Sequence, residues 1–62
     1  MKIADAEVGL PVVCGEACEE EYRFRGVGEV VDVQKDIGAI LVVPQGEWLW
    51  EFFWAEELEA LR

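Results

Sequence analysis

Hydrophobic residues in this chain fall in short runs separated by glycine and proline, and this pattern predicts an all-β fold. The runs cover residues 10–14, 29–34, 39–43 and 48–54. Each has the length of an ordinary strand, and the breaks between them contain residues that favour turns. We therefore expect a single domain over residues 1–62, folded as a small barrel of about five short antiparallel strands.

The connections between these runs carry their own signals. Residues 35–38 and 44–47 are expected to be tight turns, with Gly38 free to take the positive φ that hairpins often require. Residues 15–25 form a polar, acidic loop, and residues 55–58 are typical of a single helical or 3₁₀ turn. Pro11 cannot donate a hydrogen bond to a ladder, so the first strand is predicted to lie at a sheet edge.

The run 48–54, with the sequence WLWEFFW, is the most aromatic part of the chain. It holds all three tryptophans and two of the three phenylalanines. In an extended strand successive side chains point to opposite faces. Trp48, Trp50, Phe52 and Trp54 then share one face, while Leu49, Glu51 and Phe53 share the other. The first set is wholly apolar and is expected to face the core, with Trp48 extending past the barrel rim.

The second face of this run predicts an interaction surface. Leu49 and Phe53 would point outward, next to the run 39–43, which is apolar on both sides. Contiguous apolar patches on soluble domains usually mark an interface, and Glu51 would fix the register or pair with an Arg or Lys of the partner. The alternative is that the acidic loop or the C-terminal segment covers the patch. The predicted contact residues are Ile40, Val42, Trp48, Leu49, Glu51 and Phe53.

The charge narrows the class of partner. The chain has 14 acidic and 5 basic residues and a formal net charge of -9. This argues against binding nucleic acid or an anionic membrane, because both need Lys and Arg. The negative charge suits a basic protein partner, or serves only to keep a domain with exposed apolar residues soluble.

No apolar run approaches the ~18 residues that cross a bilayer, and the N-terminal segment does not have the pattern of a secretory signal. We therefore expect a cytoplasmic protein.

The chain has few residues of the types used in catalysis, so the sequence predicts neither an enzyme nor a cofactor or metal site. His, Ser and Thr are all absent, which leaves few general bases or nucleophiles. The glycines at 26 and 28 lead into a strand rather than a helix, so they do not form a phosphate cradle. The acidic cluster 19–21 is either a solvated loop or a metal or partner site.

Cys14 and Cys18 form a C-x₃-C pair. With no His and no further Cys, one chain lacks the usual ligands of structural zinc, although dimerisation could complete a site. A disulfide is geometrically possible if the intervening loop turns back. Free thiols are expected in a cytoplasmic protein.

From Gly26 onward the order of motifs resembles that of small SH3-like β-barrels of bacteria and plastids. A glycine-led second strand, Gly26-Val27-Gly28-Glu29-Val30-Val31-Asp32-Val33, is followed by a hairpin, a closing aromatic at Trp54, and Ala55-Glu56-Glu57-Leu58-Glu59. Val8-Gly9 matches more loosely. The nearest resemblances are to the PsaE subunit of photosystem I and the variable chain of ferredoxin:thioredoxin reductase, which implies an SH3-like fold and an accessory-subunit role.

This chain departs from those subunits in having few of the basic residues with which they meet acidic electron carriers. Our hypothesis is therefore a non-catalytic protein–protein interaction module, either a small accessory subunit or a homo-oligomer built on 39–43 and 48–54. The alternative is an acidic phage- or plasmid-type inhibitor that mimics nucleic acid and occupies a basic surface of a host protein. Salt separates the two, because a charge mimic loses its partner as ionic strength rises.

Overall fold

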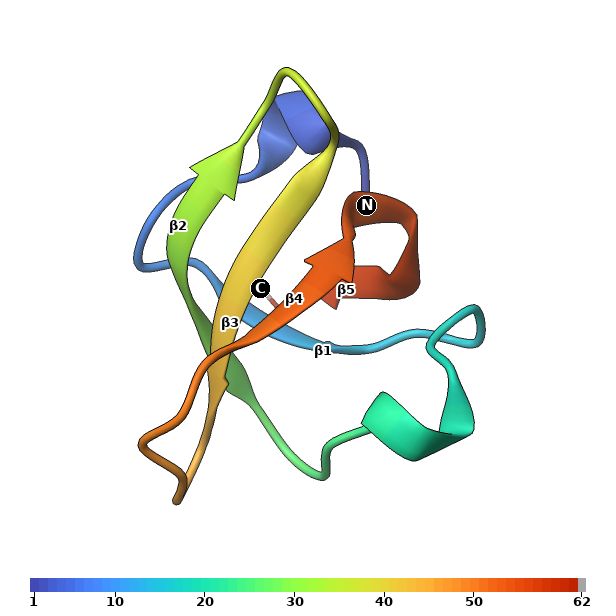
Figure 1. Cartoon of the computed structure of the whole chain (residues 1–62), viewed down its shortest axis with the longest axis vertical. Helices are drawn as coiled ribbons and strands as arrows, with labels where there is room; N and C mark the ends of the chain where they lie inside the picture. The colour runs from blue at the N-terminus through green and yellow to red at the C-terminus, as the bar shows by residue number, and fades with distance from the viewer. Residues whose placement is uncertain (62) are drawn as a thin grey trace.

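The computed structural model describes residues 1–61 and consists of five antiparallel strands with three single 3₁₀ turns (Figure 1). The strands form one sheet in the order β4-β3-β2-β1-β5. The strands are β1 (Pro11–Cys14), β2 (Gly28–Gln34), β3 (Ala39–Pro44), β4 (Glu51–Trp54) and β5 (Leu58–Ala60). The 3₁₀ turns are η1 (Ile3–Asp5), η2 (Glu20–Tyr22) and η3 (Ala55–Glu57). Within these residues, no helix has the length and apolar character needed to cross a membrane.

The predicted all-β class, with five short antiparallel strands and a 3₁₀ turn near 55–58, is confirmed. The sheet is not a closed barrel, because within residues 1–61 no ladder joins β4 to β5. The two edge strands are consecutive in the chain, and η3 turns the backbone between them (Figure 1). β5 spans three residues, and its pairs are with β1.

The prediction that the first strand lies at a sheet edge is wrong. β1 lies between β2 and β5 and pairs with both of them. Pro11 is tolerated because it is the first residue of the strand, where a missing donor is least costly. Its carbonyl still accepts a hydrogen bond from the Leu61 N–H at 2.9 Å.

The β2–β3 hairpin is the longest ladder in the sheet and explains the imperfect alternation of residues 29–34. A bulge between Val30 and Asp32 shifts the register. Val31 and Asp32 after the fully buried Val30 are therefore both exposed, and Val33 packs against the core. The predicted turn at 35–38 is confirmed, with Gly38 at φ 75° and its N–H bonded to the Gln34 carbonyl at 2.9 Å.

The core is built mainly from aliphatic side chains of modest size. The buried hydrophobic residues are Ala6, Val12, Cys18, Val30, Ala39, Ile40, Val42, Phe53, Ala55 and Leu58. Phe24, from the loop before β2, packs against this cluster. Gly28 is required by the same packing, because a Cβ there would lie 2.5 Å from the Val42 side chain and 3.2 Å from the Phe24 ring.

The corner formed by η3 is held from two sides. The Glu57 carboxylate accepts a hydrogen bond of 2.7 Å from the Trp54 N–H at the start of the turn. The terminal ammonium of Met1 donates to the carbonyls of Ala55 at 3.1 Å and Leu58 at 2.6 Å. These contacts hold the turn by which the chain passes from β4 to β5.

Candidate interaction surface

The inner face of β4 is opposite to the one that the sequence predicted. β3 and β4 pair so that Ile40 lies opposite Phe53, and directly opposed residues share a face. Ile40 and Val42 are fully buried and Phe53 is 3% exposed. The prediction that Phe53, Ile40 and Val42 form an outer contact surface is therefore wrong, because these three side chains build the core and cannot reach a partner.

The physical reason is the size of the core. Only one ring from β4 enters it, and that ring packs edge-to-face on Phe24 with centroids 5.5 Å apart and an interplanar angle of 73°. The remaining space holds Val, Ile, Leu and Ala side chains. Each aromatic ring would bring ~150–250 Å² to bury, so the four rings of the alternate set could not be accommodated.

The aromatic residues at even positions consequently lie outside. Phe52 and Trp54 pair across the ladder with Leu41 and Ala39 and are 54% and 53% exposed. Trp50, just before the strand, is 57% exposed and meets the Phe52 ring edge-to-face at 6.0 Å. The prediction that Trp50, Phe52 and Trp54 form the inner face is wrong.

The segment that leads into β4 is exposed as well. The predicted strand began at residue 48, whereas β4 begins at Glu51. Trp48 is 85% exposed and Leu49 is 60% exposed, which agrees with the prediction that both lie at the surface. Glu51 is also exposed, as predicted. It pairs with the buried Val42, but it is the first residue of β4, where the strand is open to solvent.

A groove of about 330 Å³ crosses this surface. Ile37, Phe52 and Trp54 line it together with the buried side chains of Ala39 and Phe53. Ile37, in the β2–β3 turn, is 60% exposed. We call the exposed side chains Ile37, Trp50, Phe52 and Trp54 the aromatic face. Leu49 and Trp48 precede the aromatic face directly in the chain.

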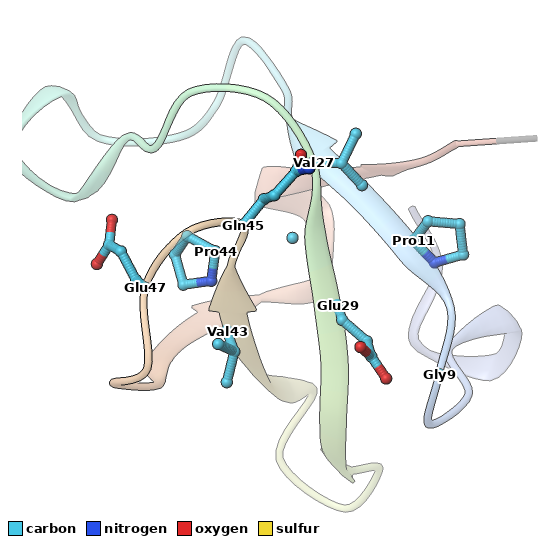
Figure 2. Close-up of a pocket in the computed structure, with 9 residues that line it drawn as sticks. Gly9, Pro11, Val27, Glu29, Val43, Pro44, Gln45 and Glu47 are labelled. Carbon is cyan, nitrogen blue, oxygen red and sulfur yellow. The ribbon is translucent and has the colours of Figure 1, made fainter.

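A second groove, of about 590 Å³, lies where β1, β2 and β3 meet (Figure 2). Figure 2 shows Glu29 on β2 and Glu47 on the loop between β3 and β4, to either side of Val43 and Pro44. Val43 alternates with Leu41 and Ala39 along β3, so it lies on the same side of the sheet as the aromatic face. The two grooves share no lining residue. The lining residues are Gly9, Pro11, Val27, Gly28, Glu29, Val43, Pro44, Gln45 and Glu47.

The charged side chains that line the two grooves are all acidic. Within residues 1–61, Glu57 lines the first groove, Glu29 and Glu47 line the second, and no Lys or Arg lines either. The only ion pair in that part of the chain is Arg23–Glu20, 3.9 Å long and on the exposed η2 turn. The first groove thus has exposed aromatic rings, and the carboxylates at the two grooves form no ion pair within residues 1–61, an arrangement that favours a cationic and partly apolar ligand.

The structure also brings the two cysteines together. The Cys18 thiol donates a hydrogen bond to the Cys14 sulfur, with 3.0 Å between the two Sγ atoms, and both cysteines are free. Burial, together with this hydrogen bond, raises the pKa of the Cys18 thiol to about 12. In residues 1–61 no group of three or more His, Cys, Asp or Glu side chains is arranged to hold a metal ion.

Comparisons with known proteins give no template for this chain. No protein-family model matches it, and no curated protein and no solved structure matches it. The resemblance to SH3-like barrels therefore stays a prediction, and we argue the function from the surface.

Proposed function

We propose that this protein is a non-catalytic protein-interaction module that binds a partner protein through the aromatic face. The observation that carries the proposal is that Phe52 and Trp54 stay more than half exposed on a strand whose other face supplies Phe53 to the core. Exposed aromatic residues cost solubility without contributing to the fold, and they are the residue types that dominate protein–protein hot spots.

The partner that fits this surface is a protein with an apolar patch and nearby Lys or Arg side chains. Tryptophan and phenylalanine rings attract cations over their faces. The carboxylates of Glu29, Glu47 and Glu57 line the two grooves and would pair with such cations. The proposed role is that of a small accessory subunit in the cytoplasm, on an SH3-like scaffold.

A second copy of the chain is a weaker candidate. Each copy carries a formal net charge of -9, and apposing two copies through this surface would bring like charges together. Like-charge juxtaposition at an interface costs several kcal/mol. Unless a cation intervenes, we therefore expect the isolated protein to be monomeric and the complex to be heteromeric.

The second candidate function is mimicry of nucleic acid by an acidic inhibitor. The observation in its favour is the excess of unpaired carboxylates, with the Arg23–Glu20 contact as the only ion pair in residues 1–61. A mimic would bind through charge and would not need the aromatic face. The two functions therefore make different demands on Phe52 and Trp54.

Site-specific photocrosslinking in the producing cells tests the proposal. A benzophenone-bearing phenylalanine analogue is introduced at position 52 or 54, and separately at position 22 as the matched control. Tyr22 is also aromatic and is 49% exposed, but it lies on η2 and lines neither groove. We expect positions 52 and 54, but not 22, to crosslink to one and the same protein.

Two outcomes would contradict the proposal. One is the absence of a crosslinked protein at 52 and 54, and the other is equal crosslinking from position 22. Repeating the crosslinking in permeabilised cells at high salt separates the two candidates. Contacts made through apolar rings survive in salt, whereas a charge mimic is released.

A further inference from the structure

Cys14 and Cys18 are held close enough to react with each other. Cys14 ends β1, and the Cys18 N–H bonds back to the Gly15 carbonyl at 3.3 Å, which returns the chain toward the strand. The two sulfur atoms are 3.0 Å apart. A disulfide bond measures about 2.05 Å, so bond formation requires the sulfurs to approach by only about 1 Å.

The surrounding contacts keep the loop in this conformation. The Arg23 guanidinium donates to the carbonyl of Cys18 at 2.8 Å and reaches that of Glu16 at 3.5 Å. The Phe24 N–H points at the Cys14 sulfur at 3.4 Å. The loop is therefore closed in the reduced protein, without help from a covalent bond.

The two thiols differ in access. Cys18 is 4% exposed and belongs to the core cluster, whereas Cys14 is half-buried. An oxidant in solution can therefore reach Cys14 first. Burial, Cys14 and Glu57 all favour the neutral thiol of Cys18, and Arg23 opposes them, with the result that the pKa of Cys18 lies at about 12. This explains why Cys14, and not Cys18, is the first group to attack the oxidant at neutral pH.

From this geometry we propose that Cys14 and Cys18 form a reversible disulfide site that is oxidised by a low-molecular-weight disulfide such as oxidised glutathione. The Cys14 thiolate attacks one sulfur of the oxidant, forming a mixed disulfide and releasing one glutathione thiolate. The Cys18 thiol then gives up its proton to the released glutathione thiolate, and its sulfur attacks the Cys14 sulfur and displaces the second glutathione thiolate. Two protons and two electrons leave the protein, and one Cys14–Cys18 bond is formed.

The site adjoins the core behind the interaction surface. Phe24, whose N–H contacts the Cys14 sulfur, packs its ring against Phe53 of β4. A bond between Cys14 and Cys18 would close the turn of residues 14–18, next to the backbone of Phe24. We therefore expect the oxidised protein to resist urea more than the reduced protein does.

Incubation of the reduced, folded protein with oxidised glutathione tests the proposal, followed by alkylation of remaining thiols and intact-mass measurement. We expect a monomer lighter than the reduced protein by two hydrogen atoms, with no alkylatable thiol, which dithiothreitol returns to two thiols. Cys18→Ala is expected to stop at the mixed disulfide on Cys14, and Cys14→Ala to remain unmodified while folded.

Three other products of the oxidation experiment would overturn the proposed disulfide site. These are a protein that keeps both thiols alkylatable, one that carries glutathione on both cysteines, and one joined to a second copy by an intermolecular disulfide. The unsubstituted protein alone decides among these outcomes, so the test does not depend on whether a variant folds.

Discussion

Phe52 and Phe53 are consecutive residues of the same type on the same strand, yet they serve different regions of the molecule. Phe53 is 3% exposed and closes the core against Phe24, whereas Phe52 is 54% exposed and packs edge-to-face on Trp50 at the surface. The difference shows that hydrophobicity alone does not decide which face of a strand is buried. The volume of the core determines which face is buried, and this core has room for one aromatic ring from β4.

The largest expected effect comes from truncating the inner residue. Phe53→Ala should lower the free energy of unfolding by about 3–5 kcal/mol, because it leaves a cavity among Ile40, Val42 and Phe24. In so small a domain this is a large share of the total stability. Phe52→Ala is the matched control and should cost less than about 1 kcal/mol. Urea unfolding followed by circular dichroism measures both, and equal losses would refute the division of β4 into a core face and a surface face.

The next expected effect is a dependence of the unfolding free energy on pH, caused by the buried thiol of Cys18. An unfolded cysteine ionises near its ordinary pKa of 9.0, whereas the pKa of folded Cys18 is about 12. The stability gained by burying the neutral thiol is therefore complete below pH 9 and is lost as the pH rises from 9 toward 12, with a slope of at most about 1.4 kcal/mol per pH unit.

Urea unfolding between neutral pH and about pH 11 measures this slope. Cys18→Ala should show a flatter decline of the unfolding free energy with pH, because it lacks this thiol. Parallel curves for the two proteins would show that Cys18 is not buried as a neutral thiol.

A smaller effect is expected where β2 approaches β3. Gly28→Ala would bring a Cβ to 2.5 Å from the Val42 side chain, and overpacking of this kind costs about 1–3 kcal/mol. Val31→Ala is the control on the same strand, since Val31 lies on the exposed side of the bulge. If Gly28→Ala is tolerated as well as Val31→Ala, the inner side of the sheet is packed less tightly than the structure indicates.

Much of the fold followed from the sequence. The glycine and proline breaks predicted the strand runs, and Gly38 predicted the hairpin turn, because these signals are local. The bulge at Val30 and Asp32 was visible only as imperfect alternation. The central place of β1 was missed because Pro11 was taken to exclude it, whereas a strand's first residue tolerates proline.

The site was only partly predictable. Trp48, Leu49 and Glu51 are exposed as expected, because they lie at the start of the strand where the core ends. Phe53 was assigned to the wrong face because the alternate positions were uniformly apolar. The signal that could have corrected this is volume, since three tryptophans and a phenylalanine cannot share a core with the aliphatic residues of β1, β2, β3 and β5.

The central claim is that the three tryptophans and Phe52 are not covered by the rest of the chain. Trp48, Trp50 and Trp54 are the only tryptophans, with exposures of 85%, 57% and 53%, so acrylamide quenching of tryptophan fluorescence reports on this surface alone. In a sample shown by sedimentation to be monomeric, we predict water-like emission and quenching nearly as efficient as in the urea-unfolded protein. Blue-shifted, quencher-resistant emission from that monomer would show that the tryptophans are buried, and would contradict the proposed interaction surface.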